Sequence, residues 1–422
     1  MRDDSMRAVR EAAAFESTVL ENGLTVRVHP MPGFTGVHAV YGTKFGSIDR
    51  AFALDGKRVE LPAGIAHFLE HKMFENEEGD AFTLYAKTGA GANAYTSFDK
   101  TCYIFSASNR VDENLDILLG FVSRPYFTQA TVEKEQGIIG QEIQQYDDSP
   151  DWRLMFAVNQ CLYHTHPVRD DIAGSARSIA AITPELLYAC ADAFYRPQNM
   201  VLAVAGNVTM DAVLAACARA GLPAKTGTVE RLMCAEPPTV AEPYREFTMA
   251  VAKPVLGVGF KEQPPQGDTL RIELVCDIIT ELVCGSMTPL YRLLYDEGLV
   301  SPGFSGELMS LPGALSFLFG GETSEPERVR GLLLDEIARL RRESADEELF
   351  ILCKNQLYGE LVQDLENVED VASTLASSFF RGHTPADEIE TLASITLSEV
   401  NAALRTMLCT DRSATVIIRP AE

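Results

Sequence analysis

Two histidines and a glutamate in the first part of the chain have the spacing of a metal-dependent hydrolase. His67, Glu70 and His71 form the string His-Phe-Leu-Glu-His in a segment that follows Pro62 and has helical apolar periodicity. Two histidines four residues apart lie on one face of a helix, so both imidazoles can reach a single ion. Glu70 shares that face, and a carboxylate beside a zinc-bound water of lowered pKa can take its proton. The pattern predicts one zinc ion per chain, bound by His67 and His71, with Glu70 as general base.

A third protein ligand is needed, because catalytic zinc usually has three and keeps one position open. Residues 131–146 predict a helix in which Glu135 and Glu142 are seven residues apart, nearly two turns. Both carboxylates then project from one face, among Ile138 and Ile139, where an unpaired charge is costly. One carboxylate can bind the metal while the other orients a ligand histidine. The spacing alone leaves open which is which.

The other candidate metal ligands have simpler explanations. His164 and His166 precede Pro167, and their spacing suits a structural loop better than a metal site. The nine cysteines are scattered and form no C-x-x-C pair, so neither a Cys-rich zinc site nor a disulfide framework is predicted. Scattered cysteines are typical of buried side chains in a reducing compartment. We therefore expect the protein in the cytoplasm.

Composition narrows the possible functions further. The chain has 422 residues, 46% of them hydrophobic and 23% charged, as in a globular protein with two or more domains. A net charge of −24 would repel phosphates, so nucleic acid is not an expected partner. The charged N-terminus lacks the apolar core of a signal peptide, and no apolar run is long enough to cross a bilayer. No membrane association is predicted.

The predicted site must be positioned by the strands and helices around it. Asn22-Gly23 between apolar runs predicts a hairpin, and residues 37–45 continue in extended form. Asp80 can cap a short helix that Gly89 ends. Residues 91–106 then predict two more strands. The histidine helix is thus expected to lie between strands that come before and after it.

An internal repeat indicates two similar halves. Residues 178–187 are echoed by residues 391–400, and each copy leads through a helix into an apolar strand. Strands followed by runs of helices in each half favour an α+β fold over a doubly wound sheet. The predicted division is 1–225 for the zinc-binding half, 226–245 for a proline-rich linker and 246–422 for the second half.

Three segments resemble the M16 family of zinc peptidases, the inverzincins that include pitrilysin, insulin-degrading enzyme and the mitochondrial processing peptidase. They are residues 64–75, 91–97 and 133–143, and the resemblance, to the processing-peptidase-like M16B branch, runs nearly end to end. It implies that Glu142 is the third zinc ligand and that Glu135 orients a ligand histidine. It also implies two halves that each contain an antiparallel sheet flanked by helices, the LuxS/MPP-like metallohydrolase fold.

The resemblance also assigns a role to Asn93, Ala94, Tyr95 and Thr96. In the family an edge strand near the metal takes an extended peptide as an added strand, through main-chain hydrogen bonds. Residues 93–96 are expected to form that strand. From the residues alone, this stretch predicts only a weak strand.

The second half departs from the family pattern. Active members carry Leu-Arg-Glu-Lys-x-Gly-Leu-x-Tyr, and here Leu294 and Ser301 stand where the Arg and Tyr that contact the substrate should be. Losing one oxyanion donor typically costs about 10²–10³ in rate. Tyr291, Arg292 or Tyr295 could replace them, although they are out of register.

These departures favour a zinc endopeptidase of short or unfolded peptides that is the zinc-bearing subunit of a dimer. In a heterodimer a paralogous subunit would supply the Arg/Tyr pair, and a homodimer is the other arrangement. Two alternatives stay open. One is a non-proteolytic, zinc-containing assembly subunit of a heterodimeric complex. The other is a small-molecule hydrolase or lyase, which a two-half chain makes less favourable.

Overall fold

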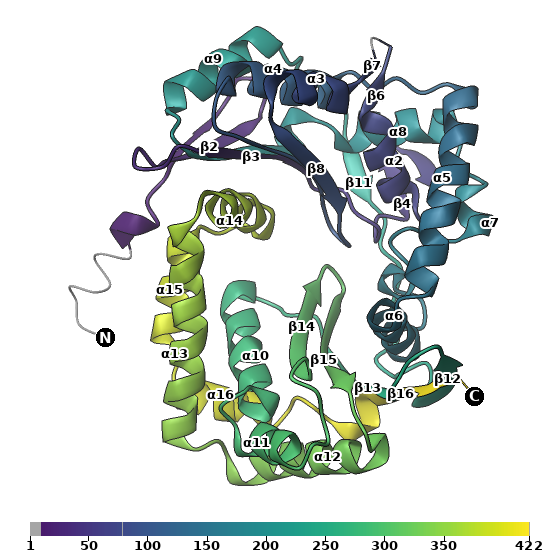
Figure 1. The fold of residues 1–422 in the computed structure, drawn as a ribbon, viewed down its shortest axis with the longest axis vertical. Helices are drawn as coiled ribbons and strands as arrows, with labels where there is room; N and C mark the ends of the chain where they lie inside the picture. The colour runs from purple at the N-terminus through teal and green to yellow at the C-terminus, as the bar shows by residue number, and fades with distance from the viewer. Residues whose placement is uncertain (1–9, 78, 422) are drawn as a thin grey trace. The chain divides into compact units, whose positions relative to one another are not determined.

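The computed structural model describes residues 10–77 and 79–421, which form two compact units (Figure 1). Neither unit is a single stretch of chain. Residues 144–170 come from the first half of the sequence but belong to unit 2, and residues 361–388 come from the second half but belong to unit 1. The two units therefore contain other segments of the chain than the halves 1–225 and 246–422. Unit 1 comprises Met1–Ile143, Asp171–Met233 and Leu361–Glu388, and unit 2 comprises Gln144–Asp170, Cys234–Glu360 and Ile389–Glu422.

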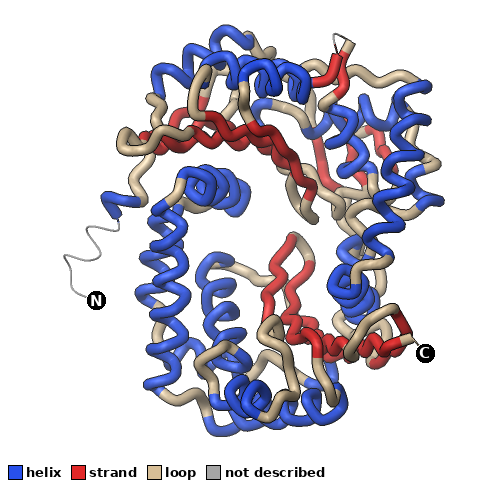
Figure 2. The backbone as a smooth tube through the Cα atoms, in the orientation of Figure 1, coloured by secondary structure: helices blue, strands red, loops and turns tan. Residues whose placement is uncertain are grey.

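Unit 1 is built on a six-stranded sheet in the order β1-β2-β10-β3-β9-β8. Strands are red and helices blue in Figure 2. The predicted hairpin is present, with Gly23 at φ 92° in the turn and the β1–β2 pair on either side. β10 runs parallel to β2, and the other neighbours are antiparallel. The strands are β1 (Glu16–Val19), β2 (Thr25–Pro30), β3 (Val37–Thr43), β8 (Gly91–Thr96), β9 (Thr101–Ala107) and β10 (Met200–Gly206).

Both faces of this sheet are covered, and β10 shows why. Leu202 and Val204 belong to one apolar core, while Val201, Ala203 and Ala205 alternate with them and belong to another. Helices α4 (Val111–Ser123) and α9 (Met210–Ala220) lie over the first face (Figure 1). Helix α14 (Val368–Arg381) covers the second, although it is far away in the sequence. A strand buried on both faces reads as the continuous apolar run seen here.

Unit 2 repeats the topology of unit 1 with five strands in the order β12-β16-β13-β15-β14. Its β16 follows helix α16 (Leu397–Leu404) as β10 follows helix α8 (Pro184–Phe194). Each of these two strands is parallel to one neighbour and antiparallel to the other. The predicted α+β fold with two similar halves is confirmed, with one parallel strand pair in each sheet. The strands are β12 (Tyr244–Met249), β13 (Val255–Glu262), β14 (Ser305–Leu311), β15 (Ala314–Glu322) and β16 (Ser413–Pro420).

Helices and short strands complete the two units. No helix within residues 10–77 and 79–421 has both the length and the apolar character of a membrane span. The remaining helices are α2 (Ile65–Met73), α3 (Ala81–Thr88), α5 (Gln129–Asp147), α6 (Pro150–Leu162), α7 (Ala176–Ile179), α10 (Thr269–Cys284), α11 (Pro289–Asp296), α12 (Pro326–Glu343), α13 (Glu347–Gln363) and α15 (Pro385–Ser394). The short strands are β4 (Ala51–Leu54), β5 (Lys57–Glu60), β6 (Glu75–Asn76), β7 (Gly79–Asp80) and β11 (Val229–Arg231).

The segment predicted as a linker is held in place by Glu236. Its carboxylate accepts hydrogen bonds of 2.7–2.9 Å from the backbone N–H groups of His164, Thr165 and His166. It also pairs with Lys261, and the exposed fractions of the two side chains are only 9% and 5%. Burial alone would raise the pKa of Glu236, but the hydrogen bonds from Lys261 and from the three backbone groups lower it to about 2.

The loop that Glu236 contacts contains His164 and His166, and both side chains have hydrogen-bond partners. His166 is almost completely buried, and its Nε2 lies 2.9 Å from the carbonyl oxygen of Pro312 while its Nδ1 accepts from the N–H of Val168. His164 Nε2 lies 3.2 Å from the hydroxyl oxygen of Thr239. Both rings are thus engaged within unit 2, which confirms the structural role predicted for them.

Replacing Glu236 by Gln is expected to destabilise unit 2 by about 3 kcal/mol at pH 7, because the buried ammonium of Lys261 loses its counter-charge. The carboxylate titrates near pH 2 when folded and near 4.5 when unfolded. Its contribution is therefore complete above pH 4.5 and is lost as the pH falls towards 2. Urea unfolding at pH 7 and pH 3 measures this, with exposed Glu230→Gln as control. An equal difference between wild type and Glu236→Gln at both pH values would contradict the prediction.

Candidate active site

Helix α2 carries the His-Phe-Leu-Glu-His string, and all of its residues except His71 are buried. Gly64 begins the helix with a φ of 87°, a left-handed conformation that favours glycine. A Cβ at this position would lie 2.4 Å from the carbonyl oxygen of Ala173, so no larger residue fits. The close contact with the loop at Ala173 sets where α2 starts and hence which way its two histidines face.

His67, His71 and Glu142 converge on one point in unit 1. One ligand atom from each can be chosen so that all three lie within 4.8 Å of one another. The Nε2 atoms of His67 and His71 are each 3.6 Å from a different carboxylate oxygen of Glu142. Donor atoms bound to one tetrahedral zinc ion at 2.0–2.2 Å are separated by about 3.3–3.6 Å. Two imidazole nitrogens and a carboxylate are donors that zinc prefers, and the two nitrogen–oxygen distances match this spacing.

Glu135 lies on the other side of the His71 ring. Its Oε1 is 3.1 Å from Nδ1 of His71, so the structure places Glu135 and Glu142 on opposite nitrogens of one imidazole. Burial lowers the pKa of His71, but the hydrogen bond to Glu135 and the charges of Glu70 and Glu142 outweigh it and raise the pKa. Of the two isoleucines expected on this face, Ile139 is buried, but Ile138 is 46% exposed.

Helix α5 is anchored by a residue that the sequence analysis missed. The amide Nε2 of Gln136 donates to the carbonyl oxygens of Ile179 and Ile182 at 3.2 and 3.3 Å. Ile179 is the last residue of α7 and Ile182 precedes α8, so the amide ties α5 to the following helices. A glutamine beside Glu135 has no distinctive sequence signal, because most glutamines on helices face solvent.

Glu70 is buried beside this group, at 7% exposure, and faces strand β8. Its Oε2 accepts a hydrogen bond of 2.7 Å from the hydroxyl of Thr96, the last residue of β8. Burial raises the pKa of Glu70, against the opposing effects of His67 and of the Thr96 hydrogen bond. A raised pKa brings a carboxylate closer to what a general base needs near neutral pH.

Strand β8 is an edge strand, as predicted for residues 93–96. It pairs with β9 along one side, and no other strand in the described part of the chain pairs with it. Tyr95 is 38% exposed, and the Asn93 side-chain oxygen accepts from the N–H of Ala94 at 2.9 Å. The described residues thus leave one edge of β8 without a neighbouring strand.

Comparison with known proteins identifies the family that shares this arrangement. Residues 56–176 match the profile described as insulinase (peptidase family M16), and residues 181–357 match that of the peptidase M16 inactive domain. The chain is 38% identical over 402 residues to uncharacterized zinc protease YmfH of Bacillus subtilis (strain 168). The aligned region covers 93% of this chain and 94% of that relative. The chain belongs to the M16 peptidase family.

Further relatives cover most of this M16 chain. An M16-like protein from Alicyclobacillus acidocaldarius has a crystal structure with a TM-score of 0.93 and 35% identity, over 97% of this chain and 98% of that one. Uncharacterized zinc protease YmxG of Bacillus subtilis (strain 168) is 25% identical over 381 residues, covering 87% of this chain and 91% of that relative. The names and the cluster of two histidines and a glutamate together support a zinc protease-like protein with the M16 fold.

Leu294 and Ser301, at the positions where the family resemblance predicts an Arg and a Tyr, both have structural roles in unit 2. Leu294 lies on α11 and is completely buried. Ser301 donates from its hydroxyl to a carboxylate oxygen of Glu322 at 2.9 Å, and its N–H bonds the carbonyl of Glu322. A buried leucine has no donor to offer, and the serine hydroxyl hydrogen is already used.

The three neighbours that could replace the missing Arg and Tyr in function differ in solvent exposure and in their hydrogen bonds. Tyr291 donates to the carbonyl oxygen of Pro302 at 3.2 Å, so its hydroxyl is engaged locally. Arg292 is exposed and lies 3.5 Å from Asp296. Tyr295 is 52% exposed. Arg292 and Tyr295 are therefore the more accessible of the three side chains.

Restoring the family arginine with Leu294→Arg is expected to destabilise the protein rather than to increase activity. The position is completely buried, and a guanidinium there would be desolvated in an apolar site, at a cost of about 3 kcal/mol or more. Leu293→Arg is the matched control, because Leu293 is adjacent on the same helix and 42% exposed. Thermal unfolding and peptide cleavage measure the outcome. A Leu294→Arg variant with wild-type melting temperature and faster cleavage would contradict this interpretation.

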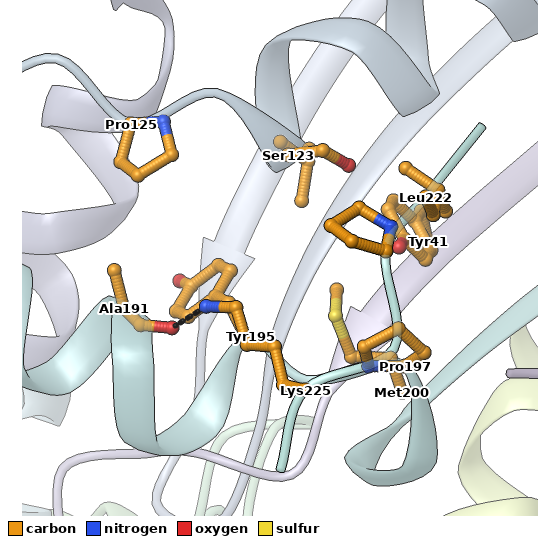
Figure 3. Close-up of a pocket in the computed structure, with 11 residues that line it drawn as sticks. Tyr41, Ser123, Pro125, Ala191, Tyr195, Pro197, Met200, Leu222 and Lys225 are labelled. Atoms are coloured by element: carbon orange, nitrogen blue, oxygen red, sulfur yellow. Dashed lines mark hydrogen bonds between the residues drawn. The ribbon is translucent and has the colours of Figure 1, made fainter. Parts of the chain in front are cut away.

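A small cavity in unit 1 is separate from these residues. Tyr41, Tyr195 and Met200 line a space of about 40 Å³ (Figure 3). Lys225 closes one side, with its ammonium donating to the carbonyl oxygen of Ala191 at 3.0 Å. Burial raises the pKa of both tyrosines, so both stay neutral. The cavity shares no lining residue with the His/Glu group, and we assign it no part in a reaction.

Proposed function

We propose that the chain is a zinc-dependent endopeptidase of short or unfolded peptides and acts as the zinc-bearing subunit of a dimer. One observation carries the proposal. His67, His71 and Glu142 present three ligand atoms within 4.8 Å of one another, and the buried carboxylate of Glu70 lies on the same helix as the two histidines. A purely structural zinc site prefers four protein ligands and needs no base. Three ligands and an adjacent carboxylate are typical of a hydrolytic site.

Each residue has a distinct role in this proposal. His67 and His71 bind zinc through Nε2 and Glu142 binds it through its carboxylate, while Glu135 holds the Nδ1–H of His71 and so fixes its tautomer and orientation. Zinc in such a site lowers the pKa of water and polarises a carbonyl. Glu70 takes the proton of the attacking water and returns it to the leaving amine nitrogen.

The substrate is an extended peptide that adds to β8 at its free edge. Strand addition uses main-chain hydrogen bonds, so it selects extended conformation more than side-chain identity. Asn93, Ala94, Tyr95 and Thr96 supply this strand, next to Glu70 through the Thr96 hydroxyl. A folded protein cannot present such a strand without local unfolding, and short or unfolded peptides are therefore the proposed class.

The second subunit is proposed from what unit 2 lacks. Leu294 is buried and the Ser301 hydroxyl is engaged, so a paralogous M16 subunit would supply the Arg/Tyr pair. The same observation, with the match to a profile described as an inactive domain, favours one alternative, a non-proteolytic zinc-containing assembly subunit. All nine cysteines lie within the described residues and none forms a disulfide, which supports the cytoplasm as the location.

Native mass spectrometry of the tagged protein isolated from its own host tests both parts of the proposal. A second chain of similar size and one zinc ion support the zinc-bearing subunit, and the isolated complex should cleave unstructured fluorogenic peptides. A zinc-loaded complex that cleaves none of them would contradict the endopeptidase and leave the assembly subunit. A zinc-loaded homodimer with full activity would contradict the heterodimer alone.

A further inference from the structure

We infer that Thr96 is a positioning residue for Glu70, and this inference rests on the proposed peptidase function. The Thr96 hydroxyl donates to Oε2 of Glu70 at 2.7 Å. A hydroxyl has one hydrogen, and here that hydrogen is directed at the carboxylate rather than at the free edge of β8. Thr96 thus differs in role from the other residues of the strand, whose main chain is proposed to bind the peptide.

Thr96 is itself held rigidly. Its β-branched side chain has few χ1 rotamers, and its oxygen lies 3.3 Å from the hydroxyl oxygen of Thr101 on the adjacent strand β9. Thr101 is completely buried and donates to the carbonyl oxygen of Phe45 at 2.9 Å. The contact with Glu70 is therefore backed by two strands of the sheet and is not a free surface interaction.

The position of the Glu70 carboxylate matters because a general base must lie within hydrogen-bond reach of the proton it takes. A misplacement of about 1 Å can cost about 10²-fold in rate. Because Oε2 accepts the hydrogen bond from Thr96, Oε1 is the oxygen proposed to take the proton of the attacking water. The strand proposed to receive the peptide also carries the hydroxyl that orients the base, so substrate binding and base positioning share one element.

Steady-state kinetics of Thr96→Val and Thr96→Ser in the zinc-loaded complex distinguish this role from substrate binding. Thr96→Val keeps the shape and removes the donor, and we expect kcat to fall by about 10–100-fold with KM within about twofold. Thr96→Ser keeps the donor and should retain kcat within about threefold. The control is Thr18→Val, at a half-buried threonine in β1, the edge strand at the opposite side of the same sheet. A higher KM with unchanged kcat, or a serine variant as slow as the valine variant, would overturn the inference.

A second measurement does not depend on peptidase activity. Melting temperatures of the metal-free protein are compared for wild type, Thr96→Val, Glu70→Ala and the double variant. If Thr96 holds Glu70, Thr96→Val should lower the melting temperature less in the Glu70→Ala background than in the wild-type background. Additive losses would overturn the contact. Coupling in this cycle without any peptide cleavage by the wild-type complex would overturn the proposed function and keep the assignment of Thr96 to Glu70.

Discussion

Glu70→Gln is expected to abolish peptide cleavage while the zinc content of the protein stays unchanged. Glutamine has the shape of glutamate but cannot take a proton, and general bases contribute about 10²–10⁴-fold to rate. Glu70 is not among the three residues whose ligand atoms converge, so its loss should leave the metal site intact. The Thr96 hydroxyl can still donate to the amide oxygen, and the local packing should be preserved. Cleavage of a quenched fluorescent peptide and elemental analysis of zinc measure the two effects.

The control for this experiment is Glu133→Gln, at an exposed glutamate of α5. It makes the same chemical change away from the converging side chains and should alter neither activity nor zinc content. Loss of zinc together with activity in Glu70→Gln would mean that Glu70 helps to bind the metal. Retention of activity would contradict its role as the base.

Glu142→Gln and Glu135→Gln are expected to differ sharply in zinc affinity. Glu142 faces Nε2 of both histidines, so replacing its carboxylate removes one of three ligands and most of the bound zinc. Glu135 contacts only the opposite nitrogen of His71, and loss of such an orienting partner typically costs about 10–100-fold in metal affinity or activity. Zinc affinity is measured by competition with a chromophoric chelator.

These two substitutions are matched, because both remove one charge from the same helix two turns apart. Retention of zinc by Glu142→Gln with loss by Glu135→Gln would exchange the two roles. Equal and small effects would contradict a three-ligand site at this position. Circular dichroism and melting temperature should be compared in parallel, since Glu135 is buried and its replacement can also loosen α5.

The sequence could predict the parts of the site that lie on one helix, but not those that depend on contacts between helices. His67, Glu70 and His71 share one helix, whose period alone dictates a common face. The spacing of Glu135 and Glu142 could not assign their roles, because these depend on the approach of α5 to α2, a tertiary contact with no local signal. Only the family resemblance predicted which of the two faces the metal. The exposure of Ile138 shows the same limit, because the pattern of α5 could not reveal where its buried face ends.

The fold was predictable to a similar extent. The repeated helix-then-strand pattern correctly indicated two related sheets, and β10 and β16 occupy equivalent places in them. The Thr96 bond to Glu70 had no sequence signal, since a threonine in a strand is ordinary. The sequence also could not predict that α14 belongs to unit 1. The amphipathic pattern of a helix indicates that it covers an apolar face, but not which face.

The placement of α14 has a consequence for how the polypeptide emerges from the ribosome. Val40, Val201 and Ala203 form part of the apolar face that α14 covers, and all are synthesised long before residues 368–381. At about 5–20 residues per second, this face stays bare for roughly 10–35 s after β10 has been made. The nascent chain therefore already contains the His/Glu group while one apolar face of its sheet is still exposed to solvent. A fragment that stops near residue 233 would share that exposure permanently and would be expected to need a chaperone or to aggregate.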